Sequence, residues 1–386
     1  MKSYNHIYET FISDENIKKS IRQFAIGRTQ KPEVKELICE TKENVEKIRK
    51  YAENYKAIKR KPIYIFDRSG KKKRKIYVPS NMEVIMQHMI VNALMPIFKK
   101  GMYEHSYASI PGRGIFDAKK VIEKQIKKNP GKVKYCLKMD IKKFFDSVPH
   151  EIILEKLREK IHDKKMMEVI EETIKCTETG LPLGFYTSQW FSNWYLQGLD
   201  HYIKEELQAE FLIRYADDMV IFGSNKRKLH KMQKKIEKYL KEKLGLTMKN
   251  NWQVFRFDYI GKDGKHHGRD LDFMGLRFFR DRTTLRKSLM LNATRKAKKI
   301  WKKEKETLHD ARQMLSYLGW IKKTDTYSMY LKWIKPFVDF GKLEKRISNY
   351  EKRRNGGISH EVVHSTEPVE TRGRGHENKL SLQLCT

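Results

Sequence analysis

Two adjacent aspartates, Asp217 and Asp218, stand inside the otherwise apolar segment RYADDMVIFG at residues 214–223. Side chains of like charge repel one another, and burying them in ionised form is costly unless a cation neutralises them. The apolar runs on either side predict a β-hairpin with both carboxylates at its turn. A chain that folds in this way has to bring a cation to the turn.

A third aspartate stands in a matching setting, because the segment YCLKMDIKKFF predicts a strand that brings Asp140 to its end. Hard divalent ions such as Mg²⁺ take oxygen ligands, and two of them can stabilise the attacking and leaving oxygens of an in-line phosphoryl transfer. A pair of aspartates at an isolated hairpin is also common as a plain turn. Together with Asp140 and the apolar flanks, however, Asp217 and Asp218 predict a site for two Mg²⁺ ions.

The charge balance points to a polyanionic partner. The chain has 386 residues with 82 Lys and Arg against 48 Asp and Glu, which gives a formal net charge of +34. Nucleic acid is the partner that such a positive surface favours. The hydrophobic content of 39% and the aromatic content of 11% are typical of a folded protein and exclude a merely basic, disordered chain.

The cysteines and the apolar segments favour a cytoplasmic protein without membrane contact. Four cysteines, Cys39, Cys136, Cys176 and Cys385, show no CxxC spacing, so neither a zinc site nor a disulfide framework is expected. The N-terminal segment lacks the apolar stretch of a signal peptide. No apolar run approaches the ~20 residues that span a bilayer.

The coarse pattern along the chain is α+β. Residues 1–60 have helical spacing, residues 62–80 predict a hairpin whose turn and second strand are rich in lysine, and short strands then alternate with helical segments. The lysine run is typical of a solvated strand edge or of a phosphate clamp. Residues 286–305 predict a basic helix, which could bind nucleic acid or an anionic membrane surface.

Six short segments resemble sequence boxes of the reverse transcriptase family, and they follow one another along the chain in the order found in that family. YADD resembles its catalytic box and LKMDIKKFFDSV the box with the first metal-binding aspartate, while the others are SYASIPGRGIFDA, GLPLGFYTSQWFSNWYL, LGLTMKNNWQVF and LDFMGLRFF. The resemblance covers roughly residues 60–340. It implies an α+β, right-hand polymerase fold and an enzyme that copies RNA into DNA.

The resemblance also implies a division of the chain. We expect a helical N-terminal region over 1–60, fingers over 61–135, a palm over 136–285 with a part near 176–200 that contacts the fingers, a basic helical thumb over 286–350, and a disordered tail over 351–386. The segment after the primer-grip box is too short for a thumb together with a ribonuclease H domain. Strand removal is therefore expected to come from elsewhere.

Individual residues match positions with known roles in the family. Asp140 and Asp217 match the principal metal ligands, and Asp218 matches a third carboxylate. Phe145 matches the ring that stacks under the incoming sugar and excludes a 2′-hydroxyl, which implies deoxynucleotides, although it could be a core residue beside Phe144. Further matches are nucleotide contacts at Arg74, Lys75, Arg113, Leu183, Gly184, Gln189 and Lys249, a primer grip at Phe273, Met274 and Gly275, and nucleic-acid backbone contacts at Arg286, Lys287, Arg295, Lys296, Lys298 and Lys299.

Lys249 matches a palm lysine suspected of protonating the pyrophosphate leaving group, but a surface lysine would look the same in the sequence. The segment PLGFYTSQ departs from the family's commonest form, because Leu183 replaces a glutamine and Gln189 replaces a proline. This form is similar to the reverse transcriptases of diversity-generating retroelements, which copy an RNA with errors at adenines. An apolar Leu183 would remove a hydrogen-bonding check on the nascent pair.

Two other functions remain open at this level. Defence-associated bacterial reverse transcriptases, which act against phage, include members with similar departures. A nucleic-acid-binding relic of a polymerase is the rival from another class, although a relic has no reason to keep three clustered carboxylates. The expected partners are template RNA, nascent cDNA, deoxynucleotides and an accessory protein of the retroelement, whose contact no sequence feature locates.

The basic surface leads to a binding prediction. Each phosphate that lysine or arginine neutralises releases a counterion, so association with RNA should weaken steeply as salt rises. Titrating a labelled RNA at several salt concentrations measures this slope. A slope close to zero between low and physiological salt would contradict an extended backbone groove.

Overall fold

The fold is known from a computed structural model that describes residues 4–28, 32–38, 40–59, 61–66 and 73–355. Two compact units make up the chain. Unit 1 comprises residues 1–113 and 131–255, and unit 2 comprises residues 114–130 and 256–386.

Unit 1 begins with helices that pack on a long apolar helix. They are α1 (Ile7–Ile12), α2 (Asp14–Ala25), α3 (Pro32–Lys35), the short 3₁₀ helix η1 (Glu36–Ile38), α4 (Lys42–Glu53) and α5 (Asn81–Lys99). Asn16 lies buried between α2 and α5, where its Nδ2 donates to the Phe11 oxygen at 2.9 Å and to the Met89 oxygen at 3.1 Å. Helices occupy most of the described residues between Ile7 and Glu53, and residues 55–59 are not helical.

The predicted hairpin is formed by β1 (Ile63–Phe66) and β2 (Lys73–Ile76), which pair antiparallel. Its turn, with Lys71 and Lys72, falls outside the described residues. Directly after β2, the backbone N–H of Tyr77 donates to the Leu183 oxygen at 2.8 Å. The base of the hairpin is therefore tied to the segment that precedes helix α10 (Tyr186–Tyr195).

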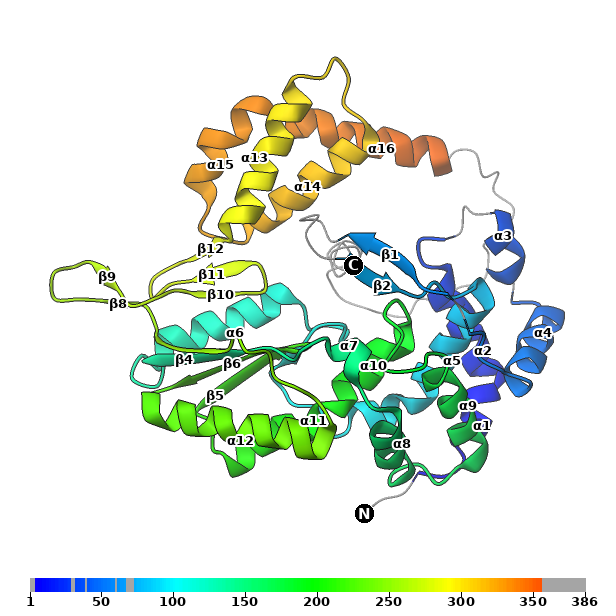
Figure 1. The fold of residues 1–386 in the computed structure, drawn as a ribbon. Coiled ribbons are helices and arrows are strands. Elements are labelled where there is room, and N and C mark those ends of the chain that lie inside the picture. Colours follow the sequence, from blue (N-terminus) through cyan, green and yellow to red (C-terminus); the bar gives the residue numbers. More distant parts are fainter. Residues whose placement is uncertain (1–3, 29–31, 39, 60, 67–72, 356–386) are drawn as a thin grey trace. The chain divides into compact units, whose positions relative to one another are not determined.

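A five-stranded sheet forms the centre of unit 1 (Figure 1), with the strand order β3-β5-β6-β4-β7. Its strands are β3 (Ser106–Tyr107), β4 (Tyr135–Met139), β5 (Phe211–Tyr215), β6 (Asp218–Gly223) and β7 (Gln253–Arg256). The central strands β5, β6 and β4 pair antiparallel; β5 and β6 are almost fully buried, and β4 is buried at three of its five residues. Helix α12 (Lys226–Leu244) packs its apolar stripe on one face of this sheet.

The remaining helices of unit 1 continue the core that the sheet begins. They are α7 (Phe144–Ser147), α8 (His150–Arg158), α9 (Lys164–Ile174), α10 (Tyr186–Tyr195), α11 (Gln197–His201) and the π-helical turn η2 (Tyr202–Glu206). On α10, Trp190 stacks on Phe98 of α5 at 5.7 Å between ring centroids, and Phe191 meets the same ring edge-on at 5.6 Å. These aromatic contacts fix α10 beside α5.

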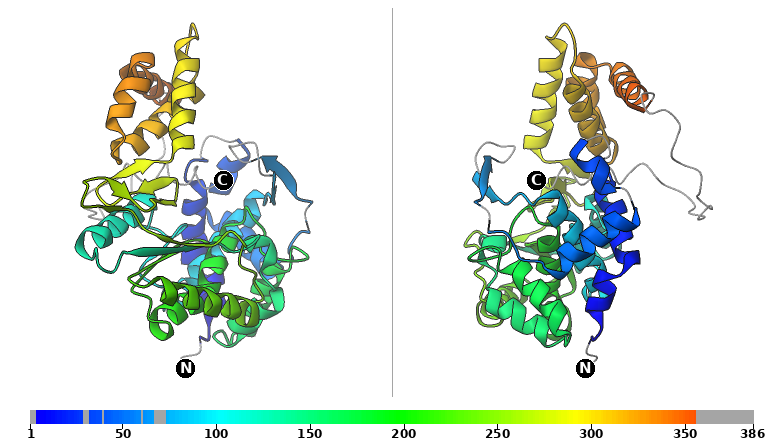
Figure 2. Two further views of the ribbon diagram at one scale, coloured as in Figure 1. Left: turned by 60° about the vertical axis from the view of Figure 1, so that its left-hand side comes forward. Right: turned by 90° about the vertical axis from the view of Figure 1, so that its right-hand side faces the viewer.

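Unit 2 is a small set of strands followed by helices (Figure 2). It contains α6 (Ile115–Lys128), β8 (Tyr259–Ile260), β9 (His266–His267), β10 (Leu271–Phe273), β11 (Leu276–Phe278), β12 (Thr283–Leu285), α13 (Lys287–Trp301), α14 (Leu308–Lys322), α15 (Tyr327–Trp333), η3 (Lys335–Phe337) and α16 (Phe340–Asn355). Strands β10, β11 and β12 form one antiparallel sheet. The predicted helical character of residues 286–350 is confirmed.

Helix α16 reaches Asn355, so residues 351–355 of the expected tail are helical, and the rest of that tail lies outside the described residues. The protein has the α+β character expected of a right-hand polymerase. None of the helices in the described ranges combines the length and apolar character that crossing a membrane requires.

A buried carboxylate stabilises the helices of unit 2. Asp310, whose side chain is 3% exposed, accepts from Lys296 Nζ at 2.7 Å and from Lys303 Nζ at 2.6 Å. It also closes a capping box with Thr307 at the start of α14. Burial alone would raise the pKa of Asp310, but the two ammonium groups hold it well below its ordinary value of 3.8.

Asp310→Asn should lower the free energy of unfolding by about 2 kcal/mol, since both lysines reach solvent and recover part of their hydration. A carboxylate with a depressed folded pKa contributes stability above its unfolded pKa and loses it as the pH falls. The wild type should therefore lose stability below pH 3.8, and the variant should lose less. Thermal unfolding above and below that pH measures both effects, with Glu344→Gln on the exposed face of α16 as the control. Equal pH profiles for wild type and Asp310→Asn would contradict this role.

Candidate active site

The central hairpin brings two of the predicted carboxylates together. Ala216 and Asp217 form the turn between β5 and β6, where Tyr215 pairs with Asp218. Asp140 directly follows β4, whose last residue, Met139, pairs with Met219 of β6. The ends of two neighbouring strands thus place Asp140 beside Asp217, as the sequence predicted.

The Asp140 and Asp217 carboxylates strongly influence each other. Burial, followed by hydrogen bonding and charge repulsion from Asp140, raises the pKa of Asp217 to about 7, and Asp218 adds further repulsion. Oδ1 of Asp140 is buried and has no hydrogen-bond partner among the described residues. The pair therefore holds more negative charge than its surroundings compensate.

Lys249 supplies a cation that touches this pair. Its Nζ contacts the carboxylate oxygen Oδ2 of Asp140. Its backbone N–H donates to the backbone carbonyl oxygen of Asp140 at 2.8 Å. A second backbone bond, from Lys142 to Thr247 at 2.8 Å, aligns the two segments. The lysine predicted near the leaving group therefore lies at the carboxylates rather than on a distant surface.

The donor set fits a hard divalent cation. Carboxylate oxygens, which are the ligands that Mg²⁺ prefers, come together here beside Lys249 Nζ, and Oδ1 of Asp140, which has no hydrogen-bond partner among the described residues, is a lone-pair site that a cation can satisfy. Asp218 is the first residue of β6. Its carboxylate does not complete a triad, since the described residues hold one group of three ligand atoms within 4.8 Å of one another, and it is a different one.

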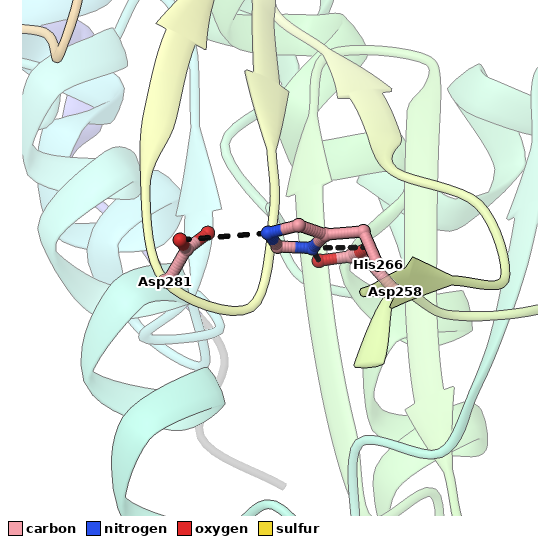
Figure 3. A group of neighbouring side chains, drawn as sticks. All are labelled: Asp258, His266 and Asp281. Atoms are coloured by element: carbon pink, nitrogen blue, oxygen red, sulfur yellow. Dashed lines mark hydrogen bonds and ion pairs between the residues drawn. The ribbon is translucent and has the colours of Figure 1, made fainter. Parts of the chain in front are cut away.

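That other group is formed by Asp258, His266 and Asp281 in unit 2 (Figure 3). Nδ1 of His266 lies 3.0 Å from both oxygens of Asp258, and Nε2 lies 3.5 Å from Asp281. Arg282 Nη1 also approaches Nε2 at 3.0 Å, so protein groups occupy both ring nitrogens. The cluster links β9 to the residue before β8 and to the segment between β11 and β12. A metal ion there would have to displace the Arg282 guanidinium.

Phe145 lies at the rim of the core on α7. Its ring is half-buried and meets Phe144 edge-on at 5.5 Å, while Phe144 is only 3% exposed. The Phe145 carbonyl accepts from Leu181 N–H at 2.6 Å. Gly180 has φ +73°, and a Cβ at this position would overlap the same carbonyl, so only glycine allows the approach. Phe144 is the core residue of the pair, and Phe145 keeps an accessible side.

The segment of Leu183 is fixed against the base of the β1–β2 hairpin through the Tyr77 hydrogen bond. Gly184 has φ +109°, and a Cβ there would overlap the Tyr77 carbonyl. Both Leu183 and Gln189 are half-buried. This attachment makes the position of Leu183 sensitive to the hairpin that carries Arg74 and Lys75.

The cations predicted to bind nucleotide phosphates differ in how exposed they are and in whether other protein groups already bind them. Arg74 and Lys75 are exposed on β2, and Lys75 lies 5.3 Å from the centroid of the Tyr77 ring. Arg113 is half-buried and donates through Nη1 to the Tyr103 oxygen at 2.9 Å. Arg74 and Lys75 can therefore reach a phosphate more easily than Arg113.

In unit 2 the predicted primer-grip residues form a tight turn between β10 and β11. Phe273 is fully buried, Met274 has φ 54° and Gly275 has φ 80°. The backbone N–H of Arg286 donates to the Gly275 oxygen at 2.9 Å. Next to this turn lies a hollow of ≈ 260 Å³ lined by Arg269, Asp270, Asp272, Arg277, Arg286 and Lys287.

The six predicted backbone-binding cations fall into two groups. Arg286 is paired with Asp272 at 2.6 Å and Lys296 with Asp310, so both are committed to ion pairs within unit 2. The others are exposed on α13, namely Lys287, Arg295, Lys298 and Lys299. Lys287, Arg295 and Lys299 lie four or eight residues apart, which places them along one helix face.

A buried ion pair behind the catalytic turn was missed by sequence reasoning. Arg214 on β5 is 1% exposed and donates to the fully buried carboxylate of Asp200 on α11 at 2.7 Å. An arginine inside the apolar run FLIRY is the sequence feature that could have revealed it, because a buried arginine needs a partner.

Comparison with known proteins identifies a family for much of the chain. The family model "Reverse transcriptase (RNA-dependent DNA polymerase)" matches residues 59–278. The chain is 26% identical over 196 residues to the retron Ec73 reverse transcriptase of Escherichia coli, covering 47% of this chain and 59% of that protein. It is 24% identical over 163 residues to protein YkfC of Escherichia coli (strain K12), covering 39% and 42%.

A third relative, the group II intron-encoded protein LtrA of Lactococcus lactis subsp. cremoris, is 26% identical over 151 residues, covering 36% of this chain and 24% of that protein. The chain thus matches only part of each relative's length. Among solved structures, apo telomerase from Candida tropicalis aligns with a TM-score of 0.44 at 15% identity, covering 83% of this chain and 64% of that chain.

Asp217→Asn should abolish nucleotide transfer and leave the fold intact, because it removes charge from a predicted metal ligand without changing volume. In wild type the raised pKa of Asp217, about 7 against an ordinary value of 3.8, makes ionisation increasingly unfavourable to folding between these pH values. The metal-free variant should therefore gain stability over wild type as the pH rises to 7.

Thermal unfolding in a chelating buffer measures that gain, with Glu242→Gln on the exposed side of α12 as the control. An unfolded Asp217→Asn variant, or one that transfers nucleotides at the wild-type rate, would contradict the assignment. Asp140→Asn is expected to behave in the same way towards activity.

Proposed function

We propose, from the premise that the chain belongs to the reverse transcriptase (RNA-dependent DNA polymerase) family, that it is an RNA-directed DNA polymerase. The family match covers more than half of the chain and includes Asp140, Asp217 and Asp218. The observation that carries the proposal is the half-buried Asp140–Asp217 pair at the ends of paired strands, in which Oδ1 of Asp140 has no hydrogen-bond partner among the described residues. Such a pair suits chemistry in which cations join it to phosphates.

Asp140 and Asp217 would hold two Mg²⁺ ions, with Asp218 as a third carboxylate. Bound there, the ions would neutralise the carboxylates and stabilise the attacking and leaving oxygens of phosphoryl transfer. Lys249 keeps a proton at Nζ beside Asp140, from where it can serve the pyrophosphate leaving group. Arg74 and Lys75 bind nucleotide phosphates, and Phe145 excludes a ribose 2′-hydroxyl.

The proposed assembly follows the family's right-hand arrangement, with fingers over residues 61–135, a palm over 136–285 and a thumb over 286–350. Template RNA and nascent cDNA contact the exposed cations of α13, which are Lys287, Arg295, Lys298 and Lys299. Deoxynucleotides are the substrates. The enzyme works in the cytoplasm, with an accessory protein of its retroelement as a further partner.

Within the family we propose an error-prone enzyme of a diversity-generating retroelement. Support comes from Leu183, whose half-buried apolar side chain stands where many relatives carry glutamine, and whose carbonyl is tied to the base of the fingers hairpin. An apolar group at this place gives no hydrogen bond to test the shape of the nascent pair. A role in phage defence is the alternative, and a template and variable repeat pair in the genomic neighbourhood would distinguish diversification from it.

Primer extension on an RNA template with Mg²⁺ and deoxynucleotides tests the proposed activity. Wild type should extend the primer and Asp140→Asn should not, while Glu242→Gln serves as a folded control. Absence of DNA product from wild type under every priming condition would favour a nucleic-acid-binding relic.

Phe145→Ala tests the sugar gate. Removing the half-buried ring should open space for a 2′-hydroxyl and raise ribonucleotide incorporation relative to deoxynucleotides by roughly ten-fold or more, as for other steric discriminations of a few kcal/mol. Competition assays with both nucleotide types give the ratio. Phe144→Leu, which changes the neighbouring core residue, should leave the ratio unchanged; an unchanged ratio in active Phe145→Ala would place Phe145 in the core instead.

Leu183→Gln tests the subgroup. A restored hydrogen bond of ~1 kcal/mol should improve discrimination several-fold, so misincorporation opposite adenine should fall at a comparable extension rate. Sequencing cDNA from an adenine-containing template measures it, with Leu183→Met as the apolar control. Accurate copying of adenine by wild type would remove the support for a diversity-generating enzyme, and slower extension with an unchanged error spectrum would make Leu183 a packing residue.

A further inference from the structure

The most deeply buried charges of unit 1 lie directly behind the catalytic turn. Arg214 is 1% exposed and Asp200 is 0% exposed, and their side chains meet at 2.7 Å. Taking two charges out of water is expensive, and replacing such a pair with apolar residues is often neutral or stabilising. Stability alone therefore gives a weak reason for this pair to lie in an otherwise apolar strand.

The guanidinium of Arg214 uses all five of its N–H groups. Nε and Nη2 donate to the carboxylate of Asp200 at 2.7–3.0 Å. Nη2 also approaches the Asn193 backbone oxygen at 3.4 Å, and Nη1 donates to Asn193 Oδ1 at 3.2 Å. The remaining donor of Nη1 reaches the Ala216 oxygen at 3.0 Å. Lysine has three donors on a flexible stem and cannot reproduce this planar set.

The contact with Ala216 matters because of the conformation of the turn. Ala216 has φ 53°, which non-glycine residues adopt at a cost of order 1 kcal/mol or more unless the surroundings hold them there. Its N–H donates to the Tyr107 oxygen at 3.3 Å, and its carbonyl accepts from Arg214. Both backbone polar groups of the residue before Asp217 are therefore fixed.

Asn193 extends the same network to a second strained turn. Its Nδ2 donates to the Ala108 oxygen at 3.1 Å, and Ala108 and Ser109 have φ 78° and 53°. One amide side chain on α10 thus links Arg214 to the segment after β3. The two turns are held by a single buried set of hydrogen bonds.

We propose that Arg214, oriented by Asp200 and Asn193, is a positioning residue that fixes the Ala216–Asp217 turn and so holds the Asp217 carboxylate against Asp140. Repulsion between these two carboxylates would otherwise move the turn away from Asp140. The guanidinium does not touch the reacting groups and acts through the Ala216 carbonyl. The proposal rests on the proposed function in that Asp140 and Asp217 are taken as metal ligands.

Mn²⁺ binding by the full-length protein without nucleic acid, followed by electron paramagnetic resonance, tests the proposal. Arg214→Lys keeps the positive charge but loses the planar set of five N–H donors. The variant should therefore bind Mn²⁺ about ten-fold more weakly, which is the size of effect seen when residues that orient metal ligands are changed. Its kcat for primer extension should fall by a similar factor, while the KM for the RNA template stays unchanged. Thermal unfolding should remain cooperative.

Ile21→Ala is the control for a purely structural loss, because Ile21 is fully buried on α2 and takes no part in the site. It should lower the melting temperature and leave Mn²⁺ affinity and kcat unchanged at a temperature where it is folded. Wild-type Mn²⁺ affinity in folded Arg214→Lys would overturn the proposal, as would an equal loss of affinity in Ile21→Ala.

If Arg214→Lys does not fold, Asn193→Ala gives the answer. It leaves the ion pair with Asp200 and removes the oxygen that anchors Nη1, the atom that also holds Ala216. Mn²⁺ affinity several-fold below wild type supports the proposal, and unchanged affinity overturns it. Because the Mn²⁺ measurement needs no DNA synthesis, a wild type that binds Mn²⁺ through Asp140 but makes no DNA would overturn the proposed function alone.

Discussion

Repulsion between two half-buried carboxylates is the constraint around which unit 1 is organised. Asp140 ends one strand and Asp217 forms the turn of the neighbouring hairpin, so the sheet register itself forces them together. The cost appears as a pKa of about 7 for Asp217 and as a buried oxygen of Asp140 without a donor. In the proposed function, cations and phosphates bound at this site would offset the repulsion.

Two kinds of residue surround Asp140 and Asp217. Some hold the backbone and side chains of the site in position, and others are exposed and are proposed to bind phosphates. Arg214 fixes the turn from behind, and Lys249 neutralises one carboxylate oxygen from the side. The Phe145 carbonyl, held by Leu181 and closely approached by Gly180, fixes the backbone of the proposed sugar gate. The Arg214 contacts are buried, and the Lys249 and Phe145 side chains are half-buried. By contrast, the proposed phosphate-binding cations on β2 are exposed, as expected of groups that must reach a ligand.

Short-range patterns in the sequence were sufficient to predict individual strands and helices. Apolar runs with turn residues predicted the strand that leads to Asp140 and the hairpin around Asp217, and the pattern of residues 286–305 predicted a basic helix where α13 lies. Contacts between distant elements could not be predicted in this way. Asp140 and Lys249 are 109 residues apart, and nothing in either segment indicates the other.

The charges on α13 show the same limit. A run of basic residues predicts a phosphate-binding face, but the sequence does not show that Lys296 pairs with Asp310 of the next helix, α14, or that Arg286 pairs with Asp272. The order of the six boxes was informative because it reports a whole fold rather than a local pattern, and the family match over residues 59–278 agrees with it.

The central claim is that cations bind at Asp140 and Asp217, and iron-directed cleavage tests it most directly. Fe²⁺ with ascorbate and peroxide generates radicals that cut the backbone next to a metal site. The account predicts cuts beside Asp140 and Asp217 that excess Mg²⁺ suppresses. Cuts confined to the segments around Asp258, His266 and Asp281, with none near Asp140 and Asp217, would contradict it.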